Sequence, residues 1–310
     1  MRGLILFGAL ILAVQAFAAE DYAWNLPKAF PKPRVPADNP MTVEKVELGR
    51  YLFYDSRMSV NGSQACATCH KQELAFTDGR PVGIGATGEK HPRGAMSLVN
   101  IAYSSVLTWA DPTMTALERQ ALVPMFGEHP IELGLRKDDG FLTMLRLNPT
   151  YGSLFTQAFA GESDPFTIAT VVKAIACFER SIISARSPYD RYHYGADENA
   201  ISDAAKRGEM IFFSQPAACF QCHGGFAFGG GFHEDAGNLK APTLRNIALT
   251  APYMHDGKVA SLEDTLEHNA HGSYQLSADQ RKDLLAFLKS LTDDELLRDP
   301  RFADPWHGKR

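Results

Sequence analysis

The sequence predicts a mainly α-helical protein with two similar domains in tandem behind an extended N-terminal arm. Three observations predict this class. Apolar residues recur at helical spacing in several capped segments, two short cysteine motifs each follow such a segment, and prolines are dense before the first helix. The length of 310 residues and the apolar fraction of 45% are ordinary for a globular chain with a sizeable core.

The first residues have the pattern of a secretory signal. A charged start precedes an apolar run that reaches Phe17, and Ala16-Phe17-Ala18 offers a small-x-small cleavage site. We therefore predict a signal peptide over 1–18 and export, to the periplasm if the source is a Gram-negative bacterium. An uncleaved anchor would need about 20 apolar residues, which is longer than this run. No later stretch is long and apolar enough to span a membrane, so no span is expected in the mature chain.

Residues 19–40 are predicted to form the extended arm on the surface. Proline removes a backbone donor and disfavours helix, and this segment holds five of them: Pro27, Pro31, Pro33, Pro36 and Pro40. The formal net charge of the chain is −5, and no run of like charges appears. Nucleic acid is therefore not an expected partner.

Two stretches are Cys-x-x-Cys-His runs, Cys66-Ala67-Thr68-Cys69-His70 and Cys219-Phe220-Gln221-Cys222-His223. This pattern is typical of c-type haem attachment, in which two thiols bond to the porphyrin and the adjacent imidazole ligates the iron. We predict two covalently bound haems, attached at Cys66, Cys69, Cys219 and Cys222, with His70 and His223 as proximal ligands. A redox dithiol or a zinc half-site is the alternative. Zinc usually takes four nearby ligands, whereas these motifs are far apart and only Cys177 remains.

A similar helix is predicted before each motif. Thr42 is the expected N-cap of the first helix and Ser202 that of the second. Gly49-Arg50-Tyr51-Leu52-Phe53 in the first helix matches Gly208-Glu209-Met210-Ile211-Phe212 in the second. The match indicates a duplicated unit. We therefore predict an N-terminal cytochrome c-like domain over 41–190 and a C-terminal one over 191–310.

Two further helices are predicted from periodicity. One begins at Asp164-Pro165-Phe166-Thr167, ends near Ser187, and contains Cys177 as a small buried hydrophobe. The other starts at a capping box of Ser277 and Gln280. The polar, turn-rich segment 187–199 is predicted to be a linker.

Segments beyond the motifs resemble the bacterial dihaem cytochrome c peroxidase and MauG superfamily. In chain order they are 48–55, 74–79, 130–134, 241–246 and 251–257. Four others look most like its MbnH-like branch: 91–98, 107–110, 187–192 and 299–306. The resemblance implies a dihaem peroxidase-type enzyme that uses hydrogen peroxide to oxidise a periplasmic protein partner by long-range electron transfer, tryptophan to kynurenine on an MbnP-like protein. A cytochrome c peroxidase fed by a small cytochrome or cupredoxin is the runner-up, and a non-enzymatic dihaem electron carrier is the third reading.

The resemblance also implies unequal roles for the two haems. The N-terminal haem takes the peroxide, so His70 would be the proximal ligand of an open iron site. Glu132 matches the distal acid-base glutamate and Gln120 a distal-pocket glutamine. Trp109 matches a tryptophan that relays oxidising equivalents between the haems. His91 is expected on the distal side or just behind it.

The sixth ligand of the second haem stays open. Relatives place a methionine or a tyrosinate there, and here Asn269 stands at the matching position. Asparagine is a poor ligand for haem iron, so an imidazole from His268 or His271 is the alternative. The axial ligand strongly shifts the haem potential.

Two more expectations come from the resemblance. Asn100 and the backbone around Pro242 match positions that bind a calcium ion between the domains, and oxygen ligands suit that ion. Arg245 is a candidate partner for a haem propionate.

Overall fold

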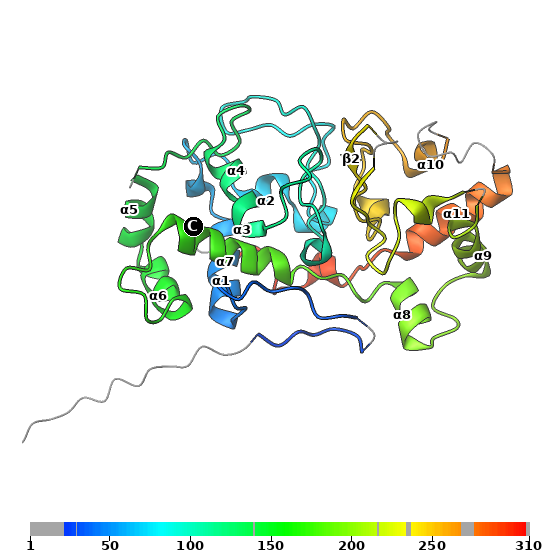
Figure 1. The fold of residues 1–310 in the computed structure, drawn as a ribbon, viewed down its shortest axis with the longest axis horizontal. Coiled ribbons are helices and arrows are strands. Elements are labelled where there is room, and N and C mark those ends of the chain that lie inside the picture. The colour runs from blue at the N-terminus through cyan, green and yellow to red at the C-terminus, as the bar shows by residue number, and fades with distance from the viewer. Residues whose placement is uncertain are drawn as a thin grey trace, which may run out of the picture.

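The computed structural model describes residues 22–28, 30–138, 140–215, 217–233, 237–267 and 276–307. Its helices form two groups at opposite ends of the molecule, α1 to α7 at one end and α8 to α11 at the other (Figure 1). The predicted signal peptide and the ligand candidates His268, Asn269 and His271 lie outside the described residues. Within the described ranges, no helix has the length and apolar character needed to cross a bilayer.

The prediction of a mainly α-helical fold is confirmed. The first group contains α1 (Val43–Phe53), α2 (Cys66–Cys69), α3 (Leu117–Gln120), α4 (Leu122–Phe126), α5 (Gly140–Leu147), α6 (Pro149–Ala158) and α7 (Ile168–Ser181). The second contains α8 (Pro188–Gly195), α9 (Asp203–Phe212), α10 (Leu262–Thr265) and α11 (Ala278–Ser290). A short antiparallel ribbon of β1 (Phe232–His233) and β2 (Leu239–Lys240) lies between α9 and α10 in the chain.

The predicted helix starts are confirmed. The Thr42 side chain accepts the backbone N–H of Lys45 at 3.2 Å to start α1, and Ser202 caps α9 in the same way. Ser277 and Gln280 form the predicted capping box of α11. The predicted end of α7 was wrong, because the helix stops at Ser181 rather than near Ser187.

The two domains repeat one helix crossing. A Cβ atom on Gly49 of α1 would lie 2.0 Å from the carbonyl oxygen of Ala174 in α7, and one on Gly208 of α9 would lie 2.0 Å from that of Asp283 in α11. Only glycine permits so close an approach. The matched glycines therefore allow the same close contact between two helices in each domain.

A phenylalanine pair closes each crossing one turn further on. The ring centroids of Phe53 and Phe178 are 5.0 Å apart in the first domain, and those of Phe212 and Phe287 are 5.2 Å apart in the second. All four side chains are fully buried. The same glycine-to-phenylalanine spacing thus builds both cores.

The predicted linker is wrong in its first half, where the structure has α8. Ser187 caps this helix by accepting the N–H of Asp190 at 3.1 Å, and Pro188 occupies the first turn. Tyr189 is 3% exposed and packs in the core of the second domain. A cap followed by proline is a helix-start signal that was present in the sequence.

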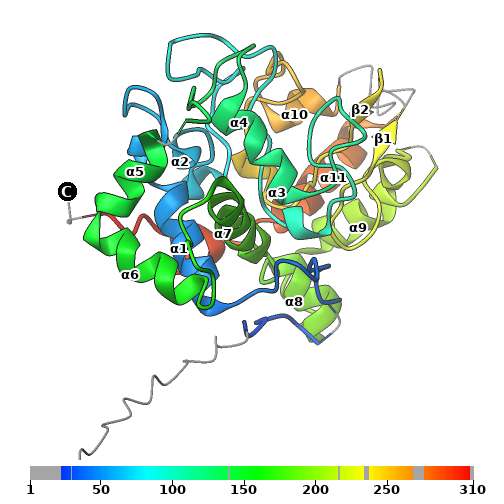
Figure 2. The same ribbon diagram turned by 60° about the vertical axis from the view of Figure 1, so that its left-hand side comes forward.

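The C-terminal segment returns to the first domain. Trp306 packs with Tyr51 and Tyr151 in the first-domain core, and Phe302 packs against Phe76 in a neighbouring cluster. Both ribbon views show the red C-terminal segment running back to the side of the molecule that carries α1 to α7 (Figures 1 and 2). The apolar side chains of Phe302 and Trp306 are therefore buried in the first domain, while the predicted bounds of the second domain remain a prediction.

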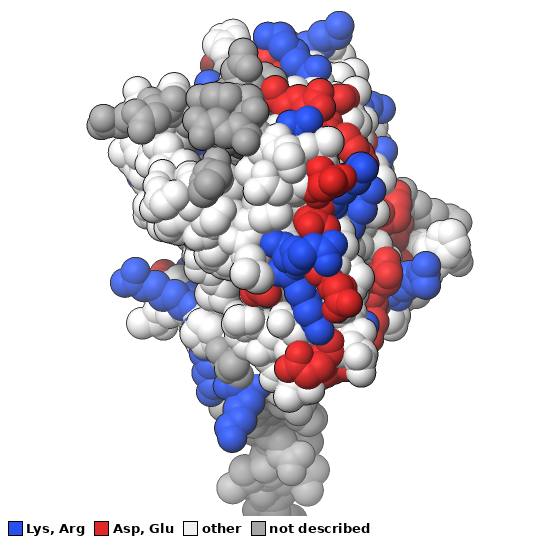
Figure 3. Space-filling model, turned by 90° about the vertical axis from the view of Figure 1, so that its right-hand side faces the viewer, with Lys and Arg blue, Asp and Glu red and all other residues white. Residues whose placement is uncertain are grey.

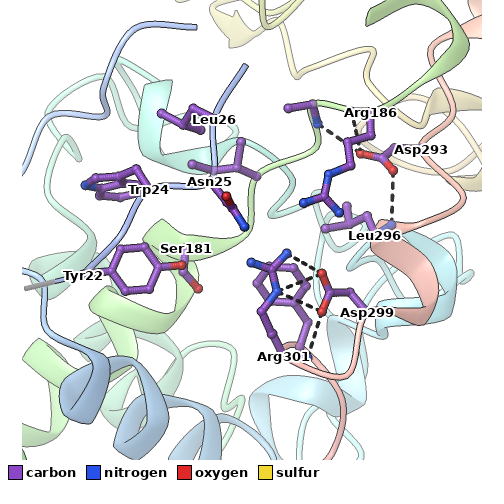
Figure 4. Close-up of a pocket in the computed structure, with 13 residues that line it drawn as sticks. Tyr22, Trp24, Asn25, Leu26, Ser181, Arg186, Asp293, Leu296, Asp299 and Arg301 are labelled. Carbon is purple, nitrogen blue, oxygen red and sulfur yellow. Dashed lines mark hydrogen bonds and ion pairs between the residues drawn. The ribbon is translucent and has the colours of Figure 1, made fainter. Parts of the chain in front are cut away.

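The arm has no regular secondary structure, as predicted, and it contacts both the second domain and the C-terminal segment. Phe30 is 6% exposed and contacts Tyr194 and Phe226 of the second domain. Tyr22 and Trp24 line a cavity of about 30 Å³ together with the C-terminal segment (Figure 4). None of the residues lining this cavity belongs to a Cys-x-x-Cys-His motif, and its volume suits little more than one water molecule.

Candidate active site

The first motif presents a histidine ready to bind metal. Nδ1 of His70 lies 2.9 Å from the carbonyl oxygen of Phe76. The carbonyl accepts the Nδ1 proton, which leaves the lone pair on Nε2. Burial lowers the pKa of His70 and so favours the neutral imidazole that ligates iron. Cys66 and Cys69 bracket α2 with half-buried side chains.

The second motif repeats this geometry with a different segment. Nδ1 of His223 lies 3.0 Å from the carbonyl oxygen of Pro242. Cys219 packs against the core of the second domain, and Gly230 approaches Cys222 so closely that a Cβ atom would lie 2.2 Å from the Cys222 carbonyl oxygen. Both motifs therefore have the oriented imidazole and the two half-buried cysteines that a c-type haem requires.

Glu132 is fixed by a neighbouring loop. Its backbone oxygen accepts the N–H of Ala86 at 2.7 Å, and a Cβ atom on Gly85 would lie 1.7 Å from the Ile131 carbonyl oxygen. The same loop carries His91, whose Nε2 is 3.9 Å from Oε1 of Glu132. The structure therefore brings Glu132 and His91 together.

The environment of Glu132 suits proton transfer. Burial raises the pKa of the Glu132 carboxyl to about 7. Burial is the main cause that raises the pKa of the Cys66 and Cys69 thiols, and the charge of Glu132 raises both further, so the carboxylate lies near the first motif. Burial lowers the pKa of His91, which keeps that imidazole neutral beside the carboxyl. A group with a pKa near neutrality can both accept and return a proton.

Gln120 is the last residue of α3 and is half-buried. The helix is anchored by Glu118, which accepts hydrogen bonds from Arg180 at 2.9 Å and Asn39 at 2.8 Å. The place of the Gln120 side chain in a distal pocket remains a prediction.

Trp109 lies at the junction between the domains. Its Nε1 donates to the carbonyl of Gly94 at 2.9 Å. The Gly94 N–H in turn donates to the backbone carbonyl of His255 in the second domain at 2.9 Å. The Trp109 carbonyl accepts the N–H of Lys240 at 3.0 Å. Backbone contacts thus join this indole to both sides of the junction.

The two calcium candidates have other partners in the structure. The side chain of Asn100 accepts the N–H of Ser184 at 2.7 Å and donates to the Ser184 carbonyl at 3.1 Å. The Pro242 carbonyl accepts from His223. Among the described residues no cluster of three acidic, histidine or cysteine side chains could hold a metal ion. These oxygens thus accept hydrogen bonds from backbone and imidazole donors, and calcium binding there remains a prediction.

Arg245 has protein partners in the structure, and its contact with a haem propionate remains a prediction. It is fully buried, its Nη1 is 2.9 Å from both carboxylate oxygens of Asp190, and its Nε donates to the Phe226 carbonyl at 2.9 Å. A buried guanidinium needs an opposite charge close by, and Asp190 supplies it.

Lys240 was missed by the sequence reasoning. It is 4% exposed, and burial lowers the pKa of its ammonium group to about 8. Its Nζ donates to Oγ of Ser104 at 3.3 Å, and the described contacts include no carboxylate for it. A buried cation with one hydroxyl partner fits an anionic group of a bound cofactor, such as a haem propionate. The only feature of the sequence that could have indicated this lysine was its position directly before the 241–246 segment, which contains Pro242.

Comparison with known proteins agrees with this geometry. Residues 43–198 match the family model described as di-haem cytochrome c peroxidase, and residues 205–292 match the cytochrome c model. A methylamine utilization protein MauG from Methylophilus methylotrophus is 34% identical, with 93% of this chain and 96% of that protein covered. The chain belongs to the di-haem cytochrome c peroxidase and MauG family. It is therefore a di-haem oxidoreductase of the peroxidase type with two c-type haems.

Other members of the family are similar over most of their length. A cytochrome c551 peroxidase from Nitrosomonas europaea is 31% identical and covers 84% of this chain and 84% of its own. A crystal structure titled as a MauG-like protein associated with microbial copper homeostasis has a TM-score of 0.85 at 38% identity, with 92% of this chain and 99% of that chain covered. The relatives of this chain thus include both proteins named cytochrome c peroxidases and MauG-type proteins.

Proposed function

We propose that this protein uses hydrogen peroxide at the first haem to oxidise a protein partner by long-range electron transfer through the second. The observation that supports it best is Glu132, a carboxyl near the first motif whose pKa is raised to about 7. Peroxide cleavage needs a proton moved from the near oxygen to the leaving one, and a group with this pKa does both at neutral pH.

In this proposal the haems supply the redox chemistry and the chain supplies protons, position and a path. Glu132 takes a proton from peroxide and returns it to the departing oxygen. The neutral His91 imidazole, 3.9 Å from the carboxylate, bounds that site without neutralising its charge. Trp109 carries the oxidising equivalent across the junction, since an indole between two groups shortens each transfer.

We further propose that the oxidised residue of the partner is a tryptophan, converted to kynurenine on an MbnP-like periplasmic protein. The similarity to the MauG-like protein associated with copper homeostasis supports this choice. The cytochrome c peroxidase reaction, in which a small cytochrome or cupredoxin donates electrons, is equally compatible with the relatives named peroxidases. A calcium ion between the domains, at Asn100 and the backbone around Pro242, stays part of the proposal on the family resemblance.

The end of the molecule that carries the second domain offers a mixed surface to such a partner. Lysine and arginine side chains alternate there with aspartate and glutamate, beside an uncharged area (Figure 3). In α9, which lies at this end, Met210 is 74% exposed, and Phe213, the residue directly after the helix, is 46% exposed. A partner without strong net charge fits this face better than a highly basic or acidic one.

The decisive experiment is co-expression with the product of a neighbouring gene, followed by intact mass measurement after addition of peroxide. Conversion of tryptophan to kynurenine adds oxygen and removes one carbon, and the modified residue is located by peptide sequencing. Rapid peroxide consumption with reduced cytochrome, and no mass change on the partner, would favour the cytochrome c peroxidase reaction. Two low-spin haems that do not react with peroxide would reject both enzymatic readings.

A further inference from the structure

The core of the first domain holds a chain of three oxidisable aromatic residues. The ring centroids of Tyr51 and Trp306 are 4.9 Å apart, and those of Trp306 and Tyr151 are 5.7 Å apart. Each of the three side chains is at most 8% exposed. The proposed peroxide reaction uses none of them.

The hydroxyl of Tyr151, the last of the three aromatic residues, has a proton acceptor in hydrogen-bond contact. The Tyr151 hydroxyl donates to Oδ2 of Asp55 at 2.8 Å, and Asp55 is 2% exposed. Arg57 compensates the buried carboxylate, with Nη2 at 2.7 Å from Asp55 Oδ2. A phenol that loses an electron becomes a strong acid, so its proton has an acceptor already in hydrogen-bond contact.

Trp306 lacks such a base. Its Nε1 donates to the backbone carbonyl of Tyr51 at 3.0 Å, and the guanidinium of Arg57 lies 4.9 Å from the indole centroid. A cation beside the ring disfavours a positive charge on the indole. An oxidising equivalent can therefore cross Trp306 but is held more stably on Tyr151, which becomes neutral once its proton has moved.

The cluster lies next to the first haem motif. Cys66, a predicted attachment point, packs against the same apolar core that contains Tyr51, Tyr151 and Trp306. A haem bonded to Cys66 would therefore have its edge beside this core.

We propose that Tyr151 stores one oxidising equivalent when no partner is available. One electron passes from Tyr151, by way of Trp306 and Tyr51, to the first haem site that hydrogen peroxide has oxidised. The hydroxyl proton moves to Oδ2 of Asp55. The products are a neutral phenoxyl radical, a protonated carboxyl and a haem site reduced by one electron. The inference rests on the proposed function only for its oxidant.

The test mixes the haem-loaded full chain with hydrogen peroxide, without partner, and freezes samples for electron paramagnetic resonance. We expect a phenoxyl radical in the wild type that is absent in Tyr151→Phe, a variant that keeps the ring and loses the hydroxyl. We also expect the haem of this variant to bleach severalfold faster under excess peroxide. Asp55→Asn should lower the radical yield, because an amide does not take the proton.

Tyr54→Phe is the matched control. The Tyr54 hydroxyl donates at 2.6 Å to the Phe302 carbonyl, which is not a base, so this variant should behave as wild type. Equal radical yield and equal bleaching in wild type and Tyr151→Phe would overturn the inference. A haem absorbance change with no radical would overturn it while leaving the proposed function intact. No absorbance change at all would overturn both.

Discussion

Glu132 combines a raised pKa with a position near the first motif, and its protonation state should control the peroxide reaction. Below a pKa of about 7 the carboxyl is protonated and cannot accept the peroxide proton. The rate of the haem absorbance change should therefore rise as pH increases through about 7. Stopped-flow measurement across this range checks the sign.

Removal of the Glu132 carboxylate should slow that step strongly. We expect Glu132→Gln to lower the rate of reaction with peroxide by about 100- to 10,000-fold, the usual contribution of an acid-base group. Glu128→Gln is the control, since Glu128 is an exposed carboxylate four residues earlier. A variant at 132 that reacts at the wild-type rate would show that this carboxyl does not move the proton.

Lys240 provides a second test at the scale of one residue. If its ammonium group binds a haem propionate, Lys240→Met removes a positive charge that stabilises the reduced haem. The midpoint potential of one haem should then fall, as measured by spectroelectrochemical titration. Lys258→Met removes an exposed lysine that pairs with Asp256 and should leave both potentials unchanged. Unchanged midpoint potentials in Lys240→Met would show that the Lys240 ammonium group does not bind a haem propionate.

The helix crossings of the two domains are alike, so the same substitution should have the same effect in each. Gly49→Ala and Gly208→Ala each force a methyl group against a backbone carbonyl, which should destabilise the affected domain by about 1–3 kcal/mol or more. In each variant, covalent haem attachment should fall first at the motif of the affected domain, measured by mass analysis of the peptides that carry the two motifs.

Gly152→Ala in α6 is the control for these variants, because a Cβ atom there meets no atom within 4 Å. This change should stabilise the protein by about 1 kcal/mol through helix propensity. An equal fall in haem attachment at both motifs in Gly49→Ala would contradict the independence of the two crossings.

The elements that the sequence predicted well are those with local signals. Thr42, Ser202 and the Ser277–Gln280 box mark helix starts within four residues, so their outcome depends little on the rest of the chain. The partners of Arg245 and Asn100 were not predictable, because Asp190 and Ser184 are separated from them by 55 and 84 residues. Such partners, distant in the sequence, are brought together only by the tertiary fold.

At the scale of the whole molecule, Trp109 tests whether the two domains work as a pair. Trp109→Phe removes the oxidisable indole and its hydrogen bond to Gly94. The first haem should still react with peroxide at the wild-type rate, while the spectral change at the second haem and the oxidation of the partner become much slower. Double-mixing absorbance measurements check both steps.

Trp24→Phe is the control, since Trp24 lies in the arm and lines a cavity that contains neither Trp109 nor a residue of either Cys-x-x-Cys-His motif. Equal rates at the second haem in wild type and Trp109→Phe would remove this indole from the transfer path. A loss of the first step as well would indicate that the variant disturbs the peroxide site.

The return of the C-terminal segment has a consequence for how the protein is made. A ribosome releases the first domain's helices long before it adds Phe302 and Trp306, yet these residues complete the cores of that domain. The domain synthesised first is thus finished last. A chain that stops short of Phe302 would therefore leave both cores of this domain incomplete.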